Sequence, residues 1–319
     1  MKKIVVLDGN TLGDMNYNLL EEFGEVKVYG MTKQDEVLER VKEANIILTN
    51  KVSLNKDNLK GCKNLELICE MATGFNNIDI EYAKNNNIAV TNVAGYSTNT
   101  VVQHTFATLL HLYDQVNYYD NFVKSGDYSK SVMFTNLDRP YNDLSGKTWG
   151  IIGLGAIGRG VAKVCEAFGM NVIYYSTSGK NNDSKYKRVD IDELLKTSDI
   201  ISIHAPLNEN TKGLMNYENI SKMKSDAFLV NMGRGPIVID EDLARAIDEE
   251  KIKGASLDVF SVEPILDTNP LLSVKNKDRL VLTPHIAWAS VEARNRLFKD
   301  LLENIRAFNR GEIRNRVEL

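Results

Sequence analysis

One stretch of the chain, residues 148–176, restricts the possible folds more than any other. It begins with an apolar run at residues 148–152 and continues into Gly153-Leu154-Gly155-Ala156-Ile157-Gly158. A helical pattern and a second apolar run follow these glycines. This order predicts a buried strand, a tight turn, an amphipathic helix and a second parallel strand, which together form one βαβ unit.

The glycines have separate tasks in such a unit. Gly153 permits the tight turn, Gly155 lets a pyrophosphate approach the backbone, and Gly158 lets the helix pack against the strand. The start of the helix, at Ala156 and Ile157, offers free N–H groups and the positive end of its dipole to phosphates. We expect these residues to bind a dinucleotide. The alternative, a glycine-rich surface turn, does not explain the flanking strands and helix.

The remaining apolar pattern is typical of an open α/β architecture. Short apolar runs alternate with helical patterns, and no internal repeat is visible. The expected strands lie at residues 3–8, 45–49, 65–69, 88–92, 200–204, 227–232, 255–260 and 280–283, and the expected helices at residues 19–23, 37–41, 80–84 and 291–309. We predict an α/β protein with two Rossmann-like, doubly wound parallel-sheet domains and a cleft between them.

The bulk properties of the chain exclude several functions. Its 319 residues are enough for two cores, and a net charge of -4 without a basic cluster argues against a nucleic-acid partner. No apolar run approaches the ~20 residues that a membrane span needs, and no signal peptide is visible. Cys62, Cys69 and Cys165 fit neither a disulfide framework nor a zinc site, so we expect no metal and a reducing, cytoplasmic location.

A long apolar helix predicts an oligomer. Residues 99–124 show a helical pattern whose apolar surface is wider than one domain should bury, and residues 126–143 read as a polar, irregular arm. We expect a homodimer that forms through this helix and arm.

Three polar residues follow strands in the second half of the chain. Arg234 offers a planar fork that suits a carboxylate, and His285 is the natural proton carrier near neutral pH. Glu263 beside His285 would orient the imidazole ring and favour its protonated form. Each residue alone is better explained as a surface charge or cap, but together, in a dinucleotide-binding chain, they form a constellation suited to hydride transfer.

The ordered motifs resemble those of the D-isomer-specific 2-hydroxyacid dehydrogenases, most closely their glycerate dehydrogenase (hydroxypyruvate reductase) branch. The motifs run along nearly the whole chain, at residues 7–12, 72–79, 96–104, 153–158, 204–207, 231–235, 258–264 and 283–290. The resemblance implies an NAD(P)-dependent oxidoreductase that reduces a small 2-keto acid, with hydroxypyruvate first and glyoxylate second. It also implies that residues 1–98 plus 290–319 form the substrate domain and residues 99–289 the dinucleotide-binding domain.

The resemblance assigns roles to single residues. Arg234 would clamp the substrate carboxylate, His285 would exchange the proton and Glu263 would hold His285. The backbone at Thr73 and Gly74 would bind the substrate carboxylate from the other domain. Among cofactor contacts, Asp258 would meet the nicotinamide carboxamide, and His204 and Pro206 would line the cofactor site.

Lys51 and His104 are less specific candidates for a role in the site. Lys51 follows the strand at residues 45–49 and could reach a substrate anion, although a solvated lysine is an equal alternative. His104 lies on the long helix, where we expect a structural role.

One departure from the family pattern leaves the choice of cofactor open. The acidic residue that binds the adenosine ribose in NAD-preferring members is replaced by Ser176, followed by Thr177. No carboxylate repels a 2′-phosphate there, and the sequence shows no arginine at that place to grip one. We therefore expect weak discrimination between NADH and NADPH.

Other functions remain as alternatives. The chain could reduce pyruvate, a branched keto acid or phosphohydroxypyruvate, or it could be a non-catalytic NAD-sensing protein like the corepressors built on this fold. Corepressors would need interaction tails, which the chain lacks. Formate dehydrogenases share the architecture but have glutamine where this chain has Glu263.

Overall fold

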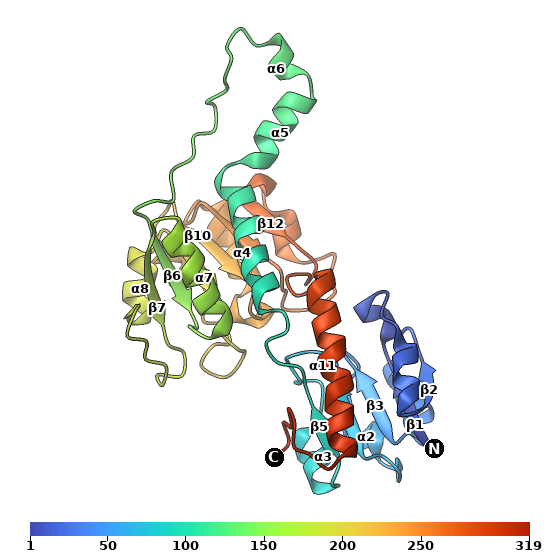
Figure 1. The fold of residues 1–319 in the computed structure, drawn as a ribbon. Coiled ribbons are helices and arrows are strands. Elements are labelled where there is room, and N and C mark those ends of the chain that lie inside the picture. The colour runs from blue at the N-terminus through green and yellow to red at the C-terminus, as the bar shows by residue number, and fades with distance from the viewer. The chain divides into compact units, whose positions relative to one another are not determined.

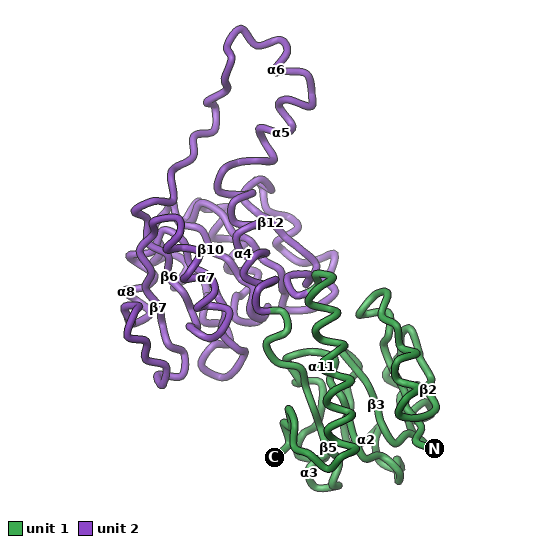
Figure 2. Tube along the Cα trace, in the orientation of Figure 1, with its two compact units in different colours: residues 1–97, 289–319 green, residues 98–288 purple.

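The computed structural model describes residues 1–319, which form two compact units. Unit 1 comprises Met1–Ser97 and Ala289–Leu319, and unit 2 comprises Thr98–Trp288 (Figure 2). Each unit is built on one sheet whose strands all run parallel, which confirms the predicted α/β fold class. None of the helices is both long and apolar enough to cross a membrane.

Unit 1 contains a five-stranded sheet in the order β2-β1-β3-β4-β5. Its central strands β3 and β4 bury every residue, as expected of a parallel sheet covered on both faces. The strands are β1 (Lys2–Val6), β2 (Gly24–Val28), β3 (Ile46–Thr49), β4 (Leu67–Glu70) and β5 (Ala89–Thr91), and the α-helices are α1 (Val37–Val41), α2 (Lys56–Leu59), α3 (Ile80–Asn85) and α11 (Val291–Asn309).

The start of unit 1 differs from the prediction in two respects. The expected helix at residues 19–23 is a 3-10 segment, Tyr17–Glu22, and the strand β2 that follows it was not predicted. Only Gly24 of β2 is buried, because β2 is an edge strand that pairs on one side with β1. An edge strand with little burial carries no strong apolar pattern, so nothing in the sequence indicated it.

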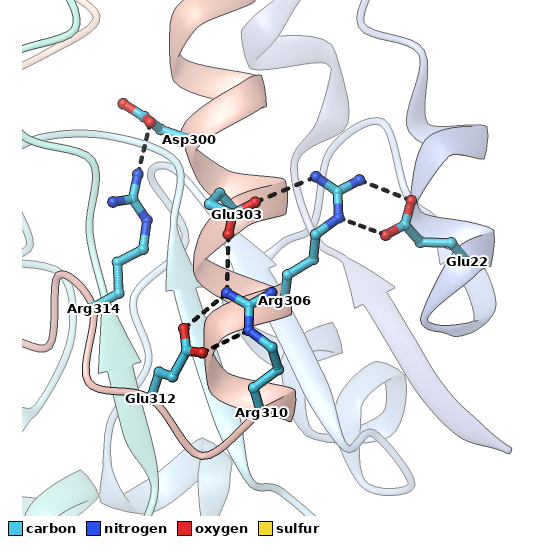
Figure 3. Close-up of polar contacts among 7 residues, drawn as sticks. All are labelled: Glu22, Asp300, Glu303, Arg306, Arg310, Glu312 and Arg314. Atoms are coloured by element: carbon cyan, nitrogen blue, oxygen red, sulfur yellow. Dashed lines mark hydrogen bonds and ion pairs between the residues drawn. The ribbon is translucent and has the colours of Figure 1, made fainter.

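The C-terminal helix α11 and the tail behind it close unit 1. Leu297, Leu301 and Ile305 are fully buried along one face of α11. The tail then runs beside β5, where the Val317 N–H donates to the carbonyl of Val90 at 2.9 Å. Figure 3 shows the solvent side, where Arg306 binds Glu22 and Arg310 binds Glu303 and Glu312. These exposed pairs fix the surface geometry but contribute little stability individually.

Unit 2 contains a seven-stranded sheet in the order β12-β11-β10-β9-β6-β7-β8. The chain order reverses at β6, with β9 on one side and β7 on the other, and ligands bind beside such a reversal at the carboxyl ends of the strands. The strands are β6 (Thr148–Ile152), β7 (Asn171–Tyr175), β8 (Lys187–Arg188), β9 (Ile200–Ile203), β10 (Phe228–Asn231), β11 (Gly254–Leu257) and β12 (Leu280–Leu282).

Helices cover the sheet of unit 2 and complete its core. Helix α4 (Thr98–Tyr113) packs against α7 (Ala156–Ala167), and its Phe106 ring lies 4.9 Å from the fully buried ring of Trp149. The remaining α-helices of the sheet layer are α8 (Ile191–Thr197), α9 (Tyr217–Ser221) and α10 (Asp240–Asp248).

The prediction of one helix over residues 99–124 is wrong. The helix breaks after Tyr113, where Gln115 has a φ of 55° and its side-chain amide donates to the Leu112 carbonyl at 2.8 Å. A second helix, α5 (Val116–Lys124), and a short one, α6 (Asp127–Lys130), follow, and neither buries a residue. In Figure 1, α5, α6 and the returning chain project from the rest of unit 2.

Candidate active site

The glycine turn between β6 and α7 has the geometry of a phosphate site. Gly153 has a φ of 93°, and a Cβ there would lie 2.9 Å from backbone atoms of Ala205. A Cβ on Gly158 would strike the Gly153 carbonyl, whereas a Cβ on Gly155 would meet nothing within 4 Å. Two of the glycines are therefore required by the protein's own packing, and Gly155 faces open space that a ligand can enter.

The N-terminus of α7 supplies hydrogen-bond donors at this turn. Its N-cap, Gly155, has no side chain to cap the helix, and the first intrahelical bond of this turn runs from the Arg159 N–H to the Gly155 carbonyl at 2.9 Å. The N–H groups of Ala156 and Ile157 thus have no acceptor within the helix. Uncapped donors beside open space fit a dinucleotide pyrophosphate.

The segment after β7 contains more contacts than the sequence indicated. Ser176 is buried, and its hydroxyl accepts the Asn181 N–H at 3.3 Å. The Asn181 side chain in turn donates to the Leu154 carbonyl at 2.6 Å and accepts from Arg159 at 3.1 Å. Arg159 therefore lies close to this segment, and its guanidinium is also paired with Asp183.

His204 has a neutral ring beside the same turn. Its Nε2 lies 3.0 Å from the Ser202 hydroxyl, which accepts a hydrogen bond from Trp149 Nε1 at 2.8 Å. Burial lowers the pKa of His204 to about 3. Its Nδ1 is buried without a hydrogen-bond partner in the chain. Pro206 lies two residues further on and is exposed.

Arg234 follows β10 directly and is half-buried. Its Nη1 donates to the Gly233 carbonyl at 2.8 Å, and no carboxylate of the chain pairs with it. A Cβ on the next residue, Gly235, would overlap the Phe260 backbone, so the two loops after β10 and β11 are in close contact. A half-buried guanidinium without an acidic partner is suited to bind an anion.

His285 and Glu263 form a direct pair at the ends of the neighbouring strands. His285 Nδ1 lies 2.6 Å from Glu263 Oε2, and the other oxygen of Glu263 accepts the Phe260 N–H at 3.0 Å. This arrangement leaves Nε2 of His285 free to meet a substrate. Arg234, Glu263 and His285 thus come from the carboxyl ends of β10, β11 and β12, which are adjacent in the sheet.

Asp258 is buried behind His285 and is engaged by the protein itself. Its carboxylate accepts hydrogen bonds from the Thr283 hydroxyl and from the N–H groups of Ile286 and Ala287, at 2.6, 2.9 and 2.8 Å. Burial alone would raise the pKa of Asp258, but hydrogen bonds from His104, Thr283 and these amides together lower it. The predicted contact between Asp258 and a nicotinamide carboxamide stays a prediction.

The candidate residues of unit 1 lie at the carboxyl ends of β3 and β4. The Thr73 hydroxyl donates to the Val93 carbonyl at 2.9 Å, while the N–H groups of Thr73 and Gly74 donate to no acceptor in the chain. Lys51 donates its backbone N–H to Asp8 at 2.6 Å, and its ammonium group is exposed. Free amides and an exposed ammonium are both suited to an anionic substrate.

Two functional-looking residues escaped the sequence analysis. Thr283 joins Asp258 to His104, which a sequence could suggest only through its place two residues before His285. Glu70 ends β4, is fully buried and has one carboxyl oxygen, Oε1, without a partner. Burial raises the pKa of Glu70 well above its ordinary value. Nothing in an apolar strand pattern indicates that its one acid is buried.

The chain is similar to known proteins over nearly its whole length. The family model described as D-isomer specific 2-hydroxyacid dehydrogenase, NAD binding domain, matches residues 106–287. A hydroxypyruvate reductase of Blautia hydrogenotrophica is 38% identical over 97% of both chains, and a glycerate dehydrogenase of Methylorubrum extorquens is 37% identical over 99% of both. A solved acyclic imino acid reductase in complex with NADPH and D-Arg superimposes with a TM-score of 0.88 at 30% identity, covering 99% of both chains.

Proposed function

The chain belongs to the D-isomer specific 2-hydroxyacid dehydrogenase family, and from this premise we propose that it reduces hydroxypyruvate to D-glycerate, with glyoxylate as a poorer substrate. Members of this family are NAD(P)-dependent oxidoreductases acting on CH–OH groups. The observation that carries the proposal is the His285–Glu263 pair at 2.6 Å, on strands next to the unpaired Arg234.

Arg234 is the proposed carboxylate clamp. Its guanidinium can form two parallel hydrogen bonds with a carboxylate, which fixes the orientation of the 2-keto group. The free amides of Thr73 and Gly74 are the second proposed carboxylate contact, and Lys51 is a third, weaker candidate.

His285 is the proposed proton donor. In the reduction, the carbonyl carbon receives a hydride and the carbonyl oxygen receives a proton. Bound nicotinamide dinucleotide supplies the hydride. His285 gives the proton from Nε2, and the carboxylate of Glu263 stabilises the imidazolium through Nδ1 before the transfer. In the oxidative direction the neutral ring takes the proton back.

The cofactor is NAD or NADP. Gly153, Gly155 and Gly158 with the amides of Ala156 and Ile157 are the proposed pyrophosphate site, and His204 and Pro206 are proposed to line the same side of the sheet. Ser176 and Thr177 offer neither a carboxylate nor a free cation, which supports weak discrimination between the two cofactors. Arg159 does not alter this proposal because Asp183 and Asn181 already bind its guanidinium.

The choice of hydroxypyruvate is supported by the relatives and by the chemistry of selection. The two relatives described above are named for hydroxypyruvate and glycerate. A site that forms hydrogen bonds with a substrate hydroxyl can reject an analogue without it by a large factor, whereas an apolar pocket discriminates methyl groups weakly. Pyruvate is therefore the informative competitor.

A homodimer is the proposed assembly, and the arm of unit 2 is the proposed interface. Along residues 132–141, Val132, Phe134 and Leu137 are 102%, 90% and 73% exposed. These side chains, together with the exposed Val116 and Val123 of α5, are apolar groups that a monomer gains nothing by exposing. A second copy is the proposed occupant because most soluble oligomers are homo-oligomers, and twofold dimers are the commonest of these.

A cytoplasmic location is the last part of the proposal. All three cysteines are unpaired, and burial raises the pKa of the Cys69 thiol to about 12, so this group stays unreactive. Free thiols are usual in a reducing compartment.

Substitution of the proposed proton donor and clamp tests the function. We expect His285→Ala to lose ~10²–10⁴ in kcat while NADH still binds, because only the proton transfer is removed. Arg234→Ala should show a similar loss of activity. Arg234→Lys should also have low activity, because a lysine lacks the planar guanidinium fork. His111→Ala, an exposed histidine of α4, is the control. Near-normal kcat/KM in either alanine variant contradicts the assignment.

A further inference from the structure

His285 stands on a backbone conformation that needs support from its surroundings. Its φ is 55°, in the left-handed region that residues other than glycine rarely adopt. Its N–H donates to the carbonyls of Asp258 at 2.8 Å and Thr283 at 3.0 Å. The next two N–H groups, of Ile286 and Ala287, donate to the Asp258 carboxylate. The loop that presents the imidazole is thus held mainly by Asp258.

Asp258 itself depends on a small number of donors. Its side chain is 1% exposed, and a buried carboxylate is costly unless hydrogen bonds and a nearby charge compensate it. No lysine or arginine lies within ion-pair distance. The one ionisable partner is His104, whose Nε2 is 3.6 Å from Oδ1.

The number of available protons fixes the donor and the acceptor of each hydrogen bond in this network. The Thr283 hydroxyl has one proton, and it donates this proton in the 2.6 Å hydrogen bond to Asp258 Oδ1. His104 Nε2 lies 3.0 Å from the same hydroxyl and must therefore donate to it. Nε2 carries a hydrogen in one neutral tautomer and in the imidazolium, so either form can donate. The donors run from His104 to Thr283 to Asp258, which in turn holds the His285 loop.

We propose that His104 is a positioning residue of the active site, which acts through Thr283 and Asp258 to fix residues 283–287 and thereby the ring of His285 against Glu263. The inference rests on the proposed function, because His285 as proton donor gives this geometry its consequence. His104 comes from α4, whose neighbouring residues Phe106 and Leu109 are buried in the core of unit 2. The network therefore connects the catalytic loop to the buried core of unit 2.

Kinetics of matched variants provide the first test. We expect His104→Ala to lower kcat about tenfold or more, since a displacement of ~1 Å can cost ~10²-fold, while the Kd of NADH stays near the wild-type value. His104→Gln should recover most of the activity because its carboxamide N–H can replace Nε2–H. Thr283→Val should reproduce the loss and Thr283→Ser should not. His111→Ala, on the same helix but exposed, is the control.

A second readout needs no substrate. The chain has four histidines, so isotope labelling of histidine alone gives a spectrum in which the His285 signal is identified by its absence in His285→Ala. In His104→Ala and Thr283→Val the ring signals of His285 should shift and broaden, because a displaced loop loosens the hydrogen bond to Glu263. The Gln and Ser variants should restore the wild-type signals.

The two readouts distinguish the failure of this proposal from failure of the proposed function. If the wild-type protein reduces no keto acid, the function is wrong, and the histidine spectrum still tests the coupling of His104 to His285. Unchanged His285 ring signals and unchanged kcat in folded His104→Ala overturn the positioning role. A lower melting temperature without either change has the same meaning, because it shows that His104 serves stability alone.

Discussion

Glu70 is a buried acid of unit 1 that the proposed chemistry does not use. Its side chain is fully buried, Asn77 donates to Oε2 at 3.0 Å, and Oε1 has no partner. Burial is the main cause that raises the pKa of Glu70, and the nearby Asp8 carboxylate adds to it. The folded protein therefore holds a proton on Glu70 that the unfolded chain releases at lower pH.

This difference predicts how stability depends on pH. Because the folded pKa of Glu70 is raised, its folded form binds more protons than the unfolded form above pH 4.5, so this group lowers the free energy of unfolding as the pH rises. Glu70→Gln should remove that loss. The free energy of unfolding of Glu70→Gln relative to wild type should therefore increase from pH 5 toward pH 8.5. The increase should be about 1.4 kcal/mol per pH unit while the pH lies between the unfolded and the folded pKa of Glu70. Urea unfolding measures it, with the exposed Glu81→Gln as control. An advantage independent of pH contradicts an uncharged Glu70.

Ser176 offers a direct test of the cofactor proposal. Asp in its place should repel a 2′-phosphate and accept hydrogen bonds from ribose hydroxyls, so Ser176→Asp should raise the ratio of NADPH Kd to NADH Kd. Fluorescence titration of both cofactors gives this ratio without turnover. In the wild type we expect modest discrimination; a preference for NADH above about a thousandfold, ~4 kcal/mol, contradicts the proposal.

The residues of the site were predictable to different degrees. Arg234 and His285 follow strands whose apolar runs are plain in the sequence, so their place at one sheet edge was predictable. The contacts of Asp258 were not predictable from the sequence. Thr283 lies 25 positions from Asp258, and His104 lies 179 positions from Thr283. Side-chain networks depend on tertiary packing that no local pattern records.

At the scale of elements, different glycines of the turn between β6 and α7 serve packing and ligand binding. Gly155→Ala adds a Cβ in open space, so the apo protein should keep its melting temperature while NADH binds at least tenfold more weakly, because the methyl group enters the proposed pyrophosphate site. Gly158→Ala puts a Cβ against the Gly153 carbonyl, and such overpacking typically costs ~1–3 kcal/mol. The Gly158 variant should therefore melt lower without any cofactor. Equal melting temperatures would contradict this division.

Strand β2 and helix α5, which the sequence predicted poorly, are both weakly buried. The strands β3 and β4 bury every residue and have clear apolar runs, whereas edge strand β2 buries only Gly24. The break between α4 and α5 depends on one residue, Gln115, in a left-handed conformation. A helical pattern continues across such a break because the residues on both sides remain helical.

At the scale of the whole molecule, the arm predicts the oligomeric state. Light scattering at micromolar concentration should give the mass of a dimer. Replacing Phe134 and Leu137 together with Asp should shift the protein toward the monomer, because both side chains would bring charge into a buried interface. Ile313→Asp is the control, since Ile313 is 75% exposed but belongs to unit 1. A monomeric wild type at this concentration would exclude the proposed assembly.

The central claim is that this oxidoreductase acts on hydroxypyruvate. Steady-state kinetics with NADH and NADPH on hydroxypyruvate, glyoxylate, pyruvate, a branched keto acid and phosphohydroxypyruvate test it most directly. The account predicts the highest kcat/KM for hydroxypyruvate, a lower value for glyoxylate, and loss of turnover in His285→Ala for every substrate reduced. If pyruvate or the branched acid gives the highest kcat/KM, the substrate assignment is contradicted and only the family membership remains; if no keto acid is reduced with either cofactor, the catalytic assignment itself is contradicted.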